Sequence, residues 1–245
     1  MLDSKVSKIA LTIALTLVAL MWLVNFIDVS LNLSLYQFGI FPLHVKGLIG
    51  IVAAPFIHST DSLAHLFNNS LPTLILTWLL FYHYRLIAPQ VFLIIYFLTG
   101  VSMWLLARET YHVGMSGVIY GLTSFLVISG FFRKNMRVAA VSLFVVFIYG
   151  SLIWGIFPIE PNISWEGHTL GFFSGIIVAV LYKNSGPQPQ KMIYEIQEEL
   201  GIHDEEEYWK ESDEEVSKSL SNEQQAKDEG KSIEIRYNYK PKNEQ

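Results

Sequence analysis

Long apolar runs recur between residues 9 and 182, and they constrain the fold more than any other feature of this sequence. A helix needs about 20 mainly apolar residues to cross the hydrocarbon core of a bilayer. Six segments approach this length and composition: 9–27, 62–81, 89–107, 115–132, 138–157 and 168–182. Because 51% of the chain is hydrophobic and only 16% is charged, they predict an all-α, polytopic membrane protein with six transmembrane helices.

Two apolar segments near the N-terminus need a separate interpretation. The run 9–27 follows Lys5 and Lys8, as in a signal peptide, but it is too long for one and lacks a small-residue cleavage site before Asp28. We therefore expect a retained first transmembrane helix. The stretch 47–57 covers only about half a span and contains a glycine and a proline. We expect it to belong to a loop that lies against the membrane face or dips into it.

The basic residues between the spans predict the orientation of the chain. Six spans place both termini on one side of the membrane. The opposite side holds only Lys46 and Arg108, whereas the side of the termini holds seven basic residues: Lys5, Lys8, Arg85, Arg133, Lys134, Arg137 and Lys183. Cytoplasmic loops carry an excess of Lys and Arg. The pattern predicts a multi-pass protein of a prokaryotic cell (inner) membrane, with both termini in the cytoplasm.

The charge balance divides the chain into two parts. Residues 1–183 carry a net charge of +3, whereas residues 184–245 carry a net charge of −8. We interpret 1–183 as the six-helix membrane domain and 184–245 as an acidic cytoplasmic tail. The tail has a short amphipathic helix at 191–200 and then a polar composition typical of disorder. It is a candidate segment for binding a cytoplasmic partner, and we expect no nucleic-acid partner.

Polar side chains occur near one end of three predicted spans. The second span contains His65 and Asn69, four residues apart and therefore on one helix face. Ser116 lies at the start of the fourth span, and His168 lies at the start of the sixth. All three spans run from the outside to the inside, so these groups meet at one depth. Polar groups in hydrocarbon are costly, and each one is a candidate functional residue.

The residue types at this depth suit nucleophilic catalysis. A serine hydroxyl is a weak nucleophile at neutral pH and needs an adjacent base, most often histidine. We predict Ser116 as the nucleophile and His168 as the base. Small residues allow close approach of two membrane helices. The two spans carry such residues at four-residue spacing: Gly117 and Gly121, and Gly171 and Gly175.

Further residues could support this reaction. The tetrahedral intermediate needs hydrogen-bond donors for its oxyanion, and His65, Asn69 and the backbone N–H of Ser116 are our candidates. Gly114 gives the backbone before the nucleophile conformational freedom. No acidic residue is placed to orient the histidine, so we expect a Ser–His dyad, with Tyr120 packing against the His168 ring.

These motifs resemble those of the rhomboid proteases. The family pattern has H-x-x-x-N in its second helix, G-x-S-G-x-x-Y-G in its fourth and G/A-H-x-x-G in its sixth. The matching residues are His65 and Asn69; Gly114, Ser116, Gly117, Tyr120 and Gly121; and Gly167, His168 and Gly171. The resemblance covers roughly residues 39–182. It implies cleavage of transmembrane or membrane-associated proteins near the outer membrane face, through an acyl-enzyme, without a cofactor or a metal.

The chain departs from the family pattern in its first loop. Many members carry a Trp-Arg pair there, and no such pair occurs between Ser30 and His58. Glu166, two residues before His168, is also unusual, and we interpret it as a solvated loop charge.

Three other classes of protein compete with the protease. A catalytically silent rhomboid-like protein would bind transmembrane clients, but such proteins usually lose the serine or the histidine. A metal site could use His58, His65 and His168, yet the H-E-x-x-H pattern of zinc proteases does not occur. A channel or transporter is disfavoured because few charges line the spans and no pair of broken helices is evident.

Overall fold

The computed structural model describes residues 4–60, 63–133, 135–158 and 164–187, together with residues 196, 199, 200 and 221. The chain divides into two compact units, Met1–Gln190 and Lys191–Gln245. The fold below is that of the first unit. The predicted amphipathic helix at 191–200 and the rest of the acidic tail lie almost entirely outside the described residues.

The described part of the first unit is helical. Its α-helices are α1 (Ser4–Leu31), α2 (Gly50–Ala53), α3 (Leu63–His83), α4 (Ala88–Leu106), α5 (Ser116–Phe132), α6 (Met136–Tyr149) and α7 (Trp165–Leu181). Shorter 3₁₀ helices occupy Leu35–Phe38, Val45–Gly47, Ala54–Phe56 and Gly150–Ile156. The one extended pairing within the described ranges is an isolated antiparallel bridge between Ile40 and His112. The predicted all-α class is therefore confirmed.

Six of these helices coincide with the six predicted spans. The largest difference concerns 138–157, where α6 ends at Tyr149 and the chain continues as a 3₁₀ helix. Side chains of α7 bind the carbonyl oxygens at the end of this segment: His168 contacts that of Gly155, and Thr169 donates to that of Ile156 at 2.9 Å. Helix α7 begins at Trp165, so His168 is its fourth residue and not its first.

Two of the described helices, α1 and α4, are long and apolar enough to cross a bilayer by themselves. Apolar helices of 10–17 residues occur at Val45–Phe56 and at α5, α6 and α7. At a rise of 1.5 Å per residue, 17 residues extend about 26 Å, slightly less than the hydrocarbon thickness of about 30 Å. The number of helices that span the membrane and the side on which the termini lie stay predictions.

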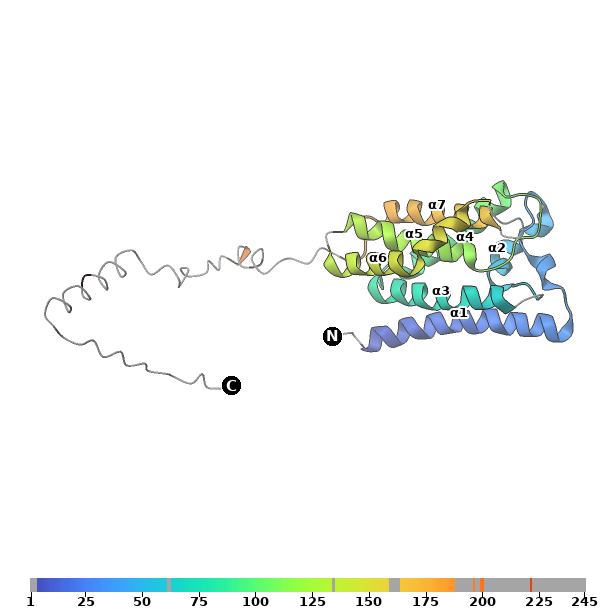
Figure 1. The fold of residues 1–245 in the computed structure, drawn as a ribbon, viewed down its shortest axis with the longest axis horizontal. Coiled ribbons are helices and arrows are strands. Elements are labelled where there is room, and N and C mark those ends of the chain that lie inside the picture. Colours follow the sequence, from blue (N-terminus) through green and yellow to red (C-terminus); the bar gives the residue numbers. More distant parts are fainter. Residues whose placement is uncertain are drawn as a thin grey trace. The chain divides into compact units, whose positions relative to one another are not determined.

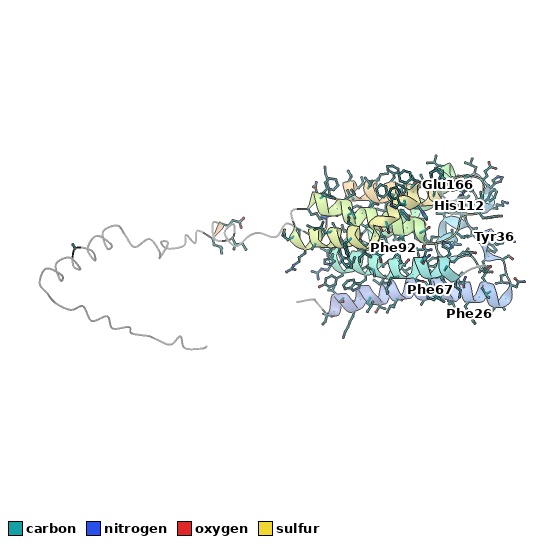
Figure 2. The ribbon with its side chains drawn as sticks, viewed as in Figure 1. Phe26, Tyr36, Phe67, Phe92, His112 and Glu166 are labelled. Atoms are coloured by element: carbon teal, nitrogen blue, oxygen red, sulfur yellow. The ribbon has the colours of Figure 1, made fainter. Side chains whose placement is uncertain are left out.

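The outer surface of the helices carries large apolar side chains. Phe26 on α1 and Phe67 on α3 are 70% and 57% exposed, and Phe147 on α6 is 86% exposed. Figure 2 marks Phe26 and Phe67 on neighbouring helices. Soluble monomers rarely expose apolar surface so extensively, whereas lipid-facing helices do.

Helix α5 lies at the centre of the bundle and packs against α3, α4, α6 and α7 (Figure 1). Its contact with α7 is the most extensive, and glycines make it close. A Cβ atom on Gly171 would collide with the carbonyl oxygen of Gly117, and one on Gly175 would collide with that of Gly121. The two glycine faces read from the sequence therefore meet each other. Helix α1 packs along α3, where the indole of Trp22 donates to the hydroxyl of Ser70 at 3.0 Å.

The first loop folds onto α4. The indole of Trp104 donates to the carbonyl of His44 at 2.9 Å, and the hydroxyl of Tyr96 donates to the carbonyl of Val52. Val45 in this loop is 82% exposed. The loop is thus helical in short pieces and apolar on its surface, and its contact with the membrane face stays a prediction.

Candidate active site

Ser116 is the first residue of α5, and Gly114 precedes it by two residues. Gly114 has φ +109°, a left-handed conformation that L side chains rarely adopt. Its N–H donates to the carbonyl of Ala54 at 2.8 Å, and a Cβ atom there would lie 2.9 Å from Nε2 of His65. Both the backbone angle and the lack of space therefore require glycine at this position. The backbone N–H of Ser116 has no acceptor within its own helix because it belongs to the first turn.

The ring of His168 is held on two sides. Its Nδ1 lies 2.9 Å from the carbonyl oxygen of Gly155. A carbonyl oxygen only accepts hydrogen bonds, so Nδ1 carries the proton of the neutral ring and Nε2 keeps its lone pair. The ring of Tyr120 stacks on it, with centroids 4.2 Å apart and planes 7° from parallel. This is the packing that we expected for Tyr120.

The orienting group of His168 was missed from the sequence. We looked for a carboxylate, the usual partner of a catalytic histidine, and expected none. The structure uses the backbone carbonyl of Gly155 instead. Any residue supplies a carbonyl, so no side-chain pattern could have indicated it.

Five of the predicted site residues line one cavity of about 610 Å³. Its lining includes Ser116 and Tyr120 from α5, His168 from α7, and His65 and Asn69 from α3. Gly117 and Gly171 do not line it and lie instead in the contact between α5 and α7. The lining also includes residues that the sequence analysis did not select, among them Ser59, His112 and Ser164.

Two of the predicted oxyanion donors come from α3. Asn69 is 4% exposed, and its amide nitrogen donates to the carbonyl of His65 at 2.8 Å. An amide has two N–H groups, so one remains to bind another acceptor. The ring of His65 is half-buried and lies against the backbone of Gly114.

His58 packs behind His65, with ring centroids 5.1 Å apart. Its Nδ1 lies 3.3 Å from the carbonyl of Phe56, and its side chain is 1% exposed. Burial, followed by the nearby ring of His65, lowers the pKa of His58 to about 4, so that its ring is neutral at pH 7. Among the residues that the structure describes, no three His, Asp or Glu side chains are grouped as metal ligands would be.

Glu166 corrects one interpretation from the sequence. It is not a solvated loop charge but a buried residue in the first turn of α7, 7% exposed. Its Oε1 lies 3.2 Å from Nε of Arg108, in the segment that connects α4 to α5. The expectation was wrong because α7 begins earlier than predicted, and because a basic side chain from a distant segment neutralises the carboxylate. The N-terminal end of a helix also favours an acidic residue.

The fold and this cavity define an all-helical membrane protein in which a serine and a histidine from two adjoining helices face one polar site. Residues 45–185 match the family model described as the Rhomboid domain, and the chain therefore belongs to the rhomboid family. Rhomboid proteins are integral to the membrane and are generally intramembrane serine proteases. The resemblance seen in the sequence motifs is thus confirmed.

The chain is also similar to uncharacterized mycobacterial proteins. One from Mycobacterium tuberculosis is 34% identical over 183 residues, which cover 69% of this chain and 74% of that protein. One from Mycobacterium leprae is 32% identical over 177 residues, covering 68% and 69% respectively. No solved structure matches the chain.

Proposed function

We propose that this protein is an intramembrane serine endopeptidase that cleaves transmembrane or membrane-associated proteins with a Ser116–His168 dyad. The observation that carries the proposal is the state of His168. The hydrogen bond from Nδ1 to Gly155 leaves Nε2 unprotonated, and the ring lines the same cavity as Ser116. A serine with a base of this kind can act as a nucleophile.

The reaction has two halves. In the first, Nε2 of His168 takes the proton of the Ser116 hydroxyl while Oγ attacks the scissile carbonyl carbon. The tetrahedral intermediate collapses, the C–N bond breaks, and His168 returns the proton to the leaving amine. The acyl-enzyme ester remains on Ser116. In the second half, His168 takes a proton from a water molecule that attacks the ester, and the proton then returns to Oγ as the carboxyl product leaves.

The charge that develops on the carbonyl oxygen needs donors already in place. The backbone N–H of Ser116, at the start of α5, is one candidate, and the positive end of the helix dipole lies there as well. The remaining N–H of Asn69 and the ring of His65 come from α3 in the same cavity. Asn69 is held by its bond to the carbonyl of His65, so this donor is oriented before substrate binds.

The substrate class follows from the surroundings of the site. The helices that carry the dyad expose apolar surface, so a substrate segment would reach the cavity from the bilayer or from its face. The distribution of Lys and Arg supports a site on the outer side, in a prokaryotic cell membrane with both termini cytoplasmic. The reaction described above uses no cofactor.

A serine-reactive fluorophosphonate tests the dyad directly. In this reaction Oγ of Ser116 displaces fluoride from phosphorus, and His168 takes the hydroxyl proton. Wild-type protein in detergent should be labelled, and Ser116→Ala and His168→Ala should not. A peptide map of the adduct should place it on Ser116.

Cleavage is measured in parallel, with a panel of single-span proteins in proteoliposomes and mass spectrometry of the fragments. Substantial proteolysis by Ser116→Ala would refute the assignment. A folded wild-type protein that neither reacts with the probe nor cleaves, but retains single-span proteins, would instead favour the catalytically silent client-binding class.

A further inference from the structure

Two side-chain bridges connect the start of α7 to the segment between α4 and α5. The first is the ion pair between Arg108 and Glu166, with Nε and Oε1 3.2 Å apart. The carboxylate side chain is 9% exposed, whereas the guanidinium side chain is 40% exposed. The second joins His112 to Ser164, with Nδ1 and Oγ 2.7 Å apart. Figure 2 shows Glu166 and His112 at the same end of the bundle.

The hydrogen bonds of His112 define its tautomer. Its Nε2 lies 3.0 Å from the carbonyl oxygen of Arg108, which can only accept. Nε2 therefore carries the proton of the neutral ring, and Nδ1 accepts a hydrogen bond from the hydroxyl of Ser164. Burial is the main influence on the pKa of His112 and lowers it, which favours this neutral form at pH 7. The backbone of His112 also pairs with that of Ile40 in the first loop.

Ser164 occupies the N-cap position of α7 without capping the helix. A serine at this position usually accepts a hydrogen bond from an N–H of the first turn. Here the side chain makes no such bond and contacts His112 instead. The hydroxyl thus connects two elements of the fold and does not stabilise the end of its own helix.

Both bridges are adjacent in sequence to the dyad. His112 precedes Ser116 by four residues, and Glu166 precedes His168 by two. The N–H of His168 donates to the carbonyl of Ser164 at 3.3 Å, so the base and the bridging serine share one helical turn. The bridges therefore join the segment that leads into the nucleophile to the segment that leads into the base.

The contact between α5 and α7 leaves a role for such bridges. Its glycines allow close approach but present no side chains that interlock. Besides the stacking of Tyr120 on His168, the hydroxyl of Ser124 donates to the carbonyl of Phe172 at 2.8 Å. Polar bridges at one end can define how far α7 slides or turns against α5. A displacement of about 1 Å at a catalytic group can lower a rate about 100-fold.

We propose that Arg108–Glu166 and His112–Ser164 form a clamp that positions His168 against Ser116, with Glu166 and Ser164 as positioning residues. The proposal rests on the function proposed above. It predicts that breaking either bridge slows the chemical step without weakening the binding of substrate.

The test compares folded variants by their rate of fluorophosphonate labelling and by kcat and KM on one single-span substrate. Glu166→Gln removes the charge of the clamp but keeps the shape of the side chain. Its matched control is Glu109→Gln, which removes the same charge from an exposed residue next to Arg108. We expect Glu166→Gln to lower kcat and the labelling rate together by about 10- to 100-fold, with KM within about threefold. The control should stay within about twofold of wild type in all three quantities.

Ser164→Ala breaks the second bridge by removing one oxygen atom, and Ser164→Thr restores a hydroxyl. The alanine variant should lower kcat, and the threonine variant should recover a larger share of it, at similar melting temperatures. A change in packing alone would not follow the hydroxyl in this way. The double variant Arg108→Gln/Glu166→Gln should be no slower than Glu166→Gln, since both partners act through one contact.

The clamp would be overturned if the wild-type protein is labelled at Ser116 and the folded variants Glu166→Gln and Ser164→Ala are labelled at the same rate. The proposed protease would then remain intact. Absence of labelling in wild type would instead reject the protease itself. If Glu166→Gln does not fold, Ser164→Ala and Ser164→Thr decide the question.

Discussion

Replacing Gly171 by alanine tests how closely the dyad depends on the contact between α5 and α7. A Cβ atom at this position would meet three backbone atoms of Gly117: the carbonyl oxygen, the carbonyl carbon at 2.8 Å and Cα at 3.1 Å. Non-bonded carbon atoms pack at about 3.5–4.0 Å, so the two carbon contacts are too short by roughly 0.5–1 Å. The atoms belong to the backbone of a helix and cannot rotate away. Helix α7 must therefore move outward by about this amount.

Stability and activity should respond differently to this movement. Overpacking costs about 1–3 kcal/mol, whereas replacing glycine by alanine inside a helix gains about 1 kcal/mol. The net loss of about 0–2 kcal/mol is small. His168 lies one turn before Gly171 and moves with α7, and a displacement near 1 Å can lower kcat by about 100-fold. We expect a modest fall in melting temperature and a large fall in kcat.

A second glycine provides the matched control. A Cβ atom on Gly150, at the end of α6, would meet only the side chain of Val146, at an ordinary 4.0 Å. Gly150→Ala should therefore leave kcat within about twofold of wild type. Both variants are purified in detergent and assayed on one single-span substrate, with the melting temperature measured on the same preparations. If the kcat of Gly171→Ala equals that of the wild type, the close approach of α7 to α5 does not set the geometry of the dyad and the reasoning is refuted.

Four other predictions can be checked, three with the same substrate and one by thermal melting. Ser116→Ala and His168→Ala should each reduce cleavage to background. The double variant should cleave no more slowly than either single variant, because the effects of substitutions within one catalytic unit are not additive. A substantial kcat in either single variant would contradict the prediction. Asn69→Ala should lower kcat by about 10- to 1000-fold with little change in KM, as loss of one oxyanion donor does; a raised KM at normal kcat would mean that Asn69 binds substrate. Burial lowers the pKa of His58 from the ordinary 6.5 to about 4, so the folded protein keeps this ring neutral. The stability that the neutral ring gives the folded protein is present above pH 6.5 and is lost as the pH falls toward 4. The loss approaches about 3 kcal/mol, and melting curves of His58→Gln should depend less on pH over this range. Removal of residues 190–245 should leave activity in detergent largely unchanged, since no candidate catalytic group lies there; inactivity of a monodisperse truncated protein would contradict this.

The positions of the helices could be predicted from the sequence because each helix depends on the apolar composition of a short stretch of residues. A run such as 89–107 is apolar enough to predict a helix at any place in the fold, and α4 begins and ends within one residue of it. That Ser116 and His168 lie at the same end of the bundle could be inferred in the same way, because alternate helices were predicted to run in the same direction. The glycines of α5 and α7 likewise indicated which faces come close.

Contacts between distant segments decided the rest of the site. The carbonyl of Gly155 orients His168 only because the 3₁₀ helix after α6 folds over the start of α7. Glu166 is buried only because Arg108, 58 positions earlier in the chain, reaches it. The hydroxyl of Ser164 likewise binds His112 instead of capping α7. The spacing of residues along the chain carries no information about such pairs, because each pair depends on the relative positions of two distant segments in the folded protein. The sequence alone therefore indicated five residues of the candidate site, whereas the packing of the helices added others, such as His112 and Ser164, and decided which atoms hold the site in position.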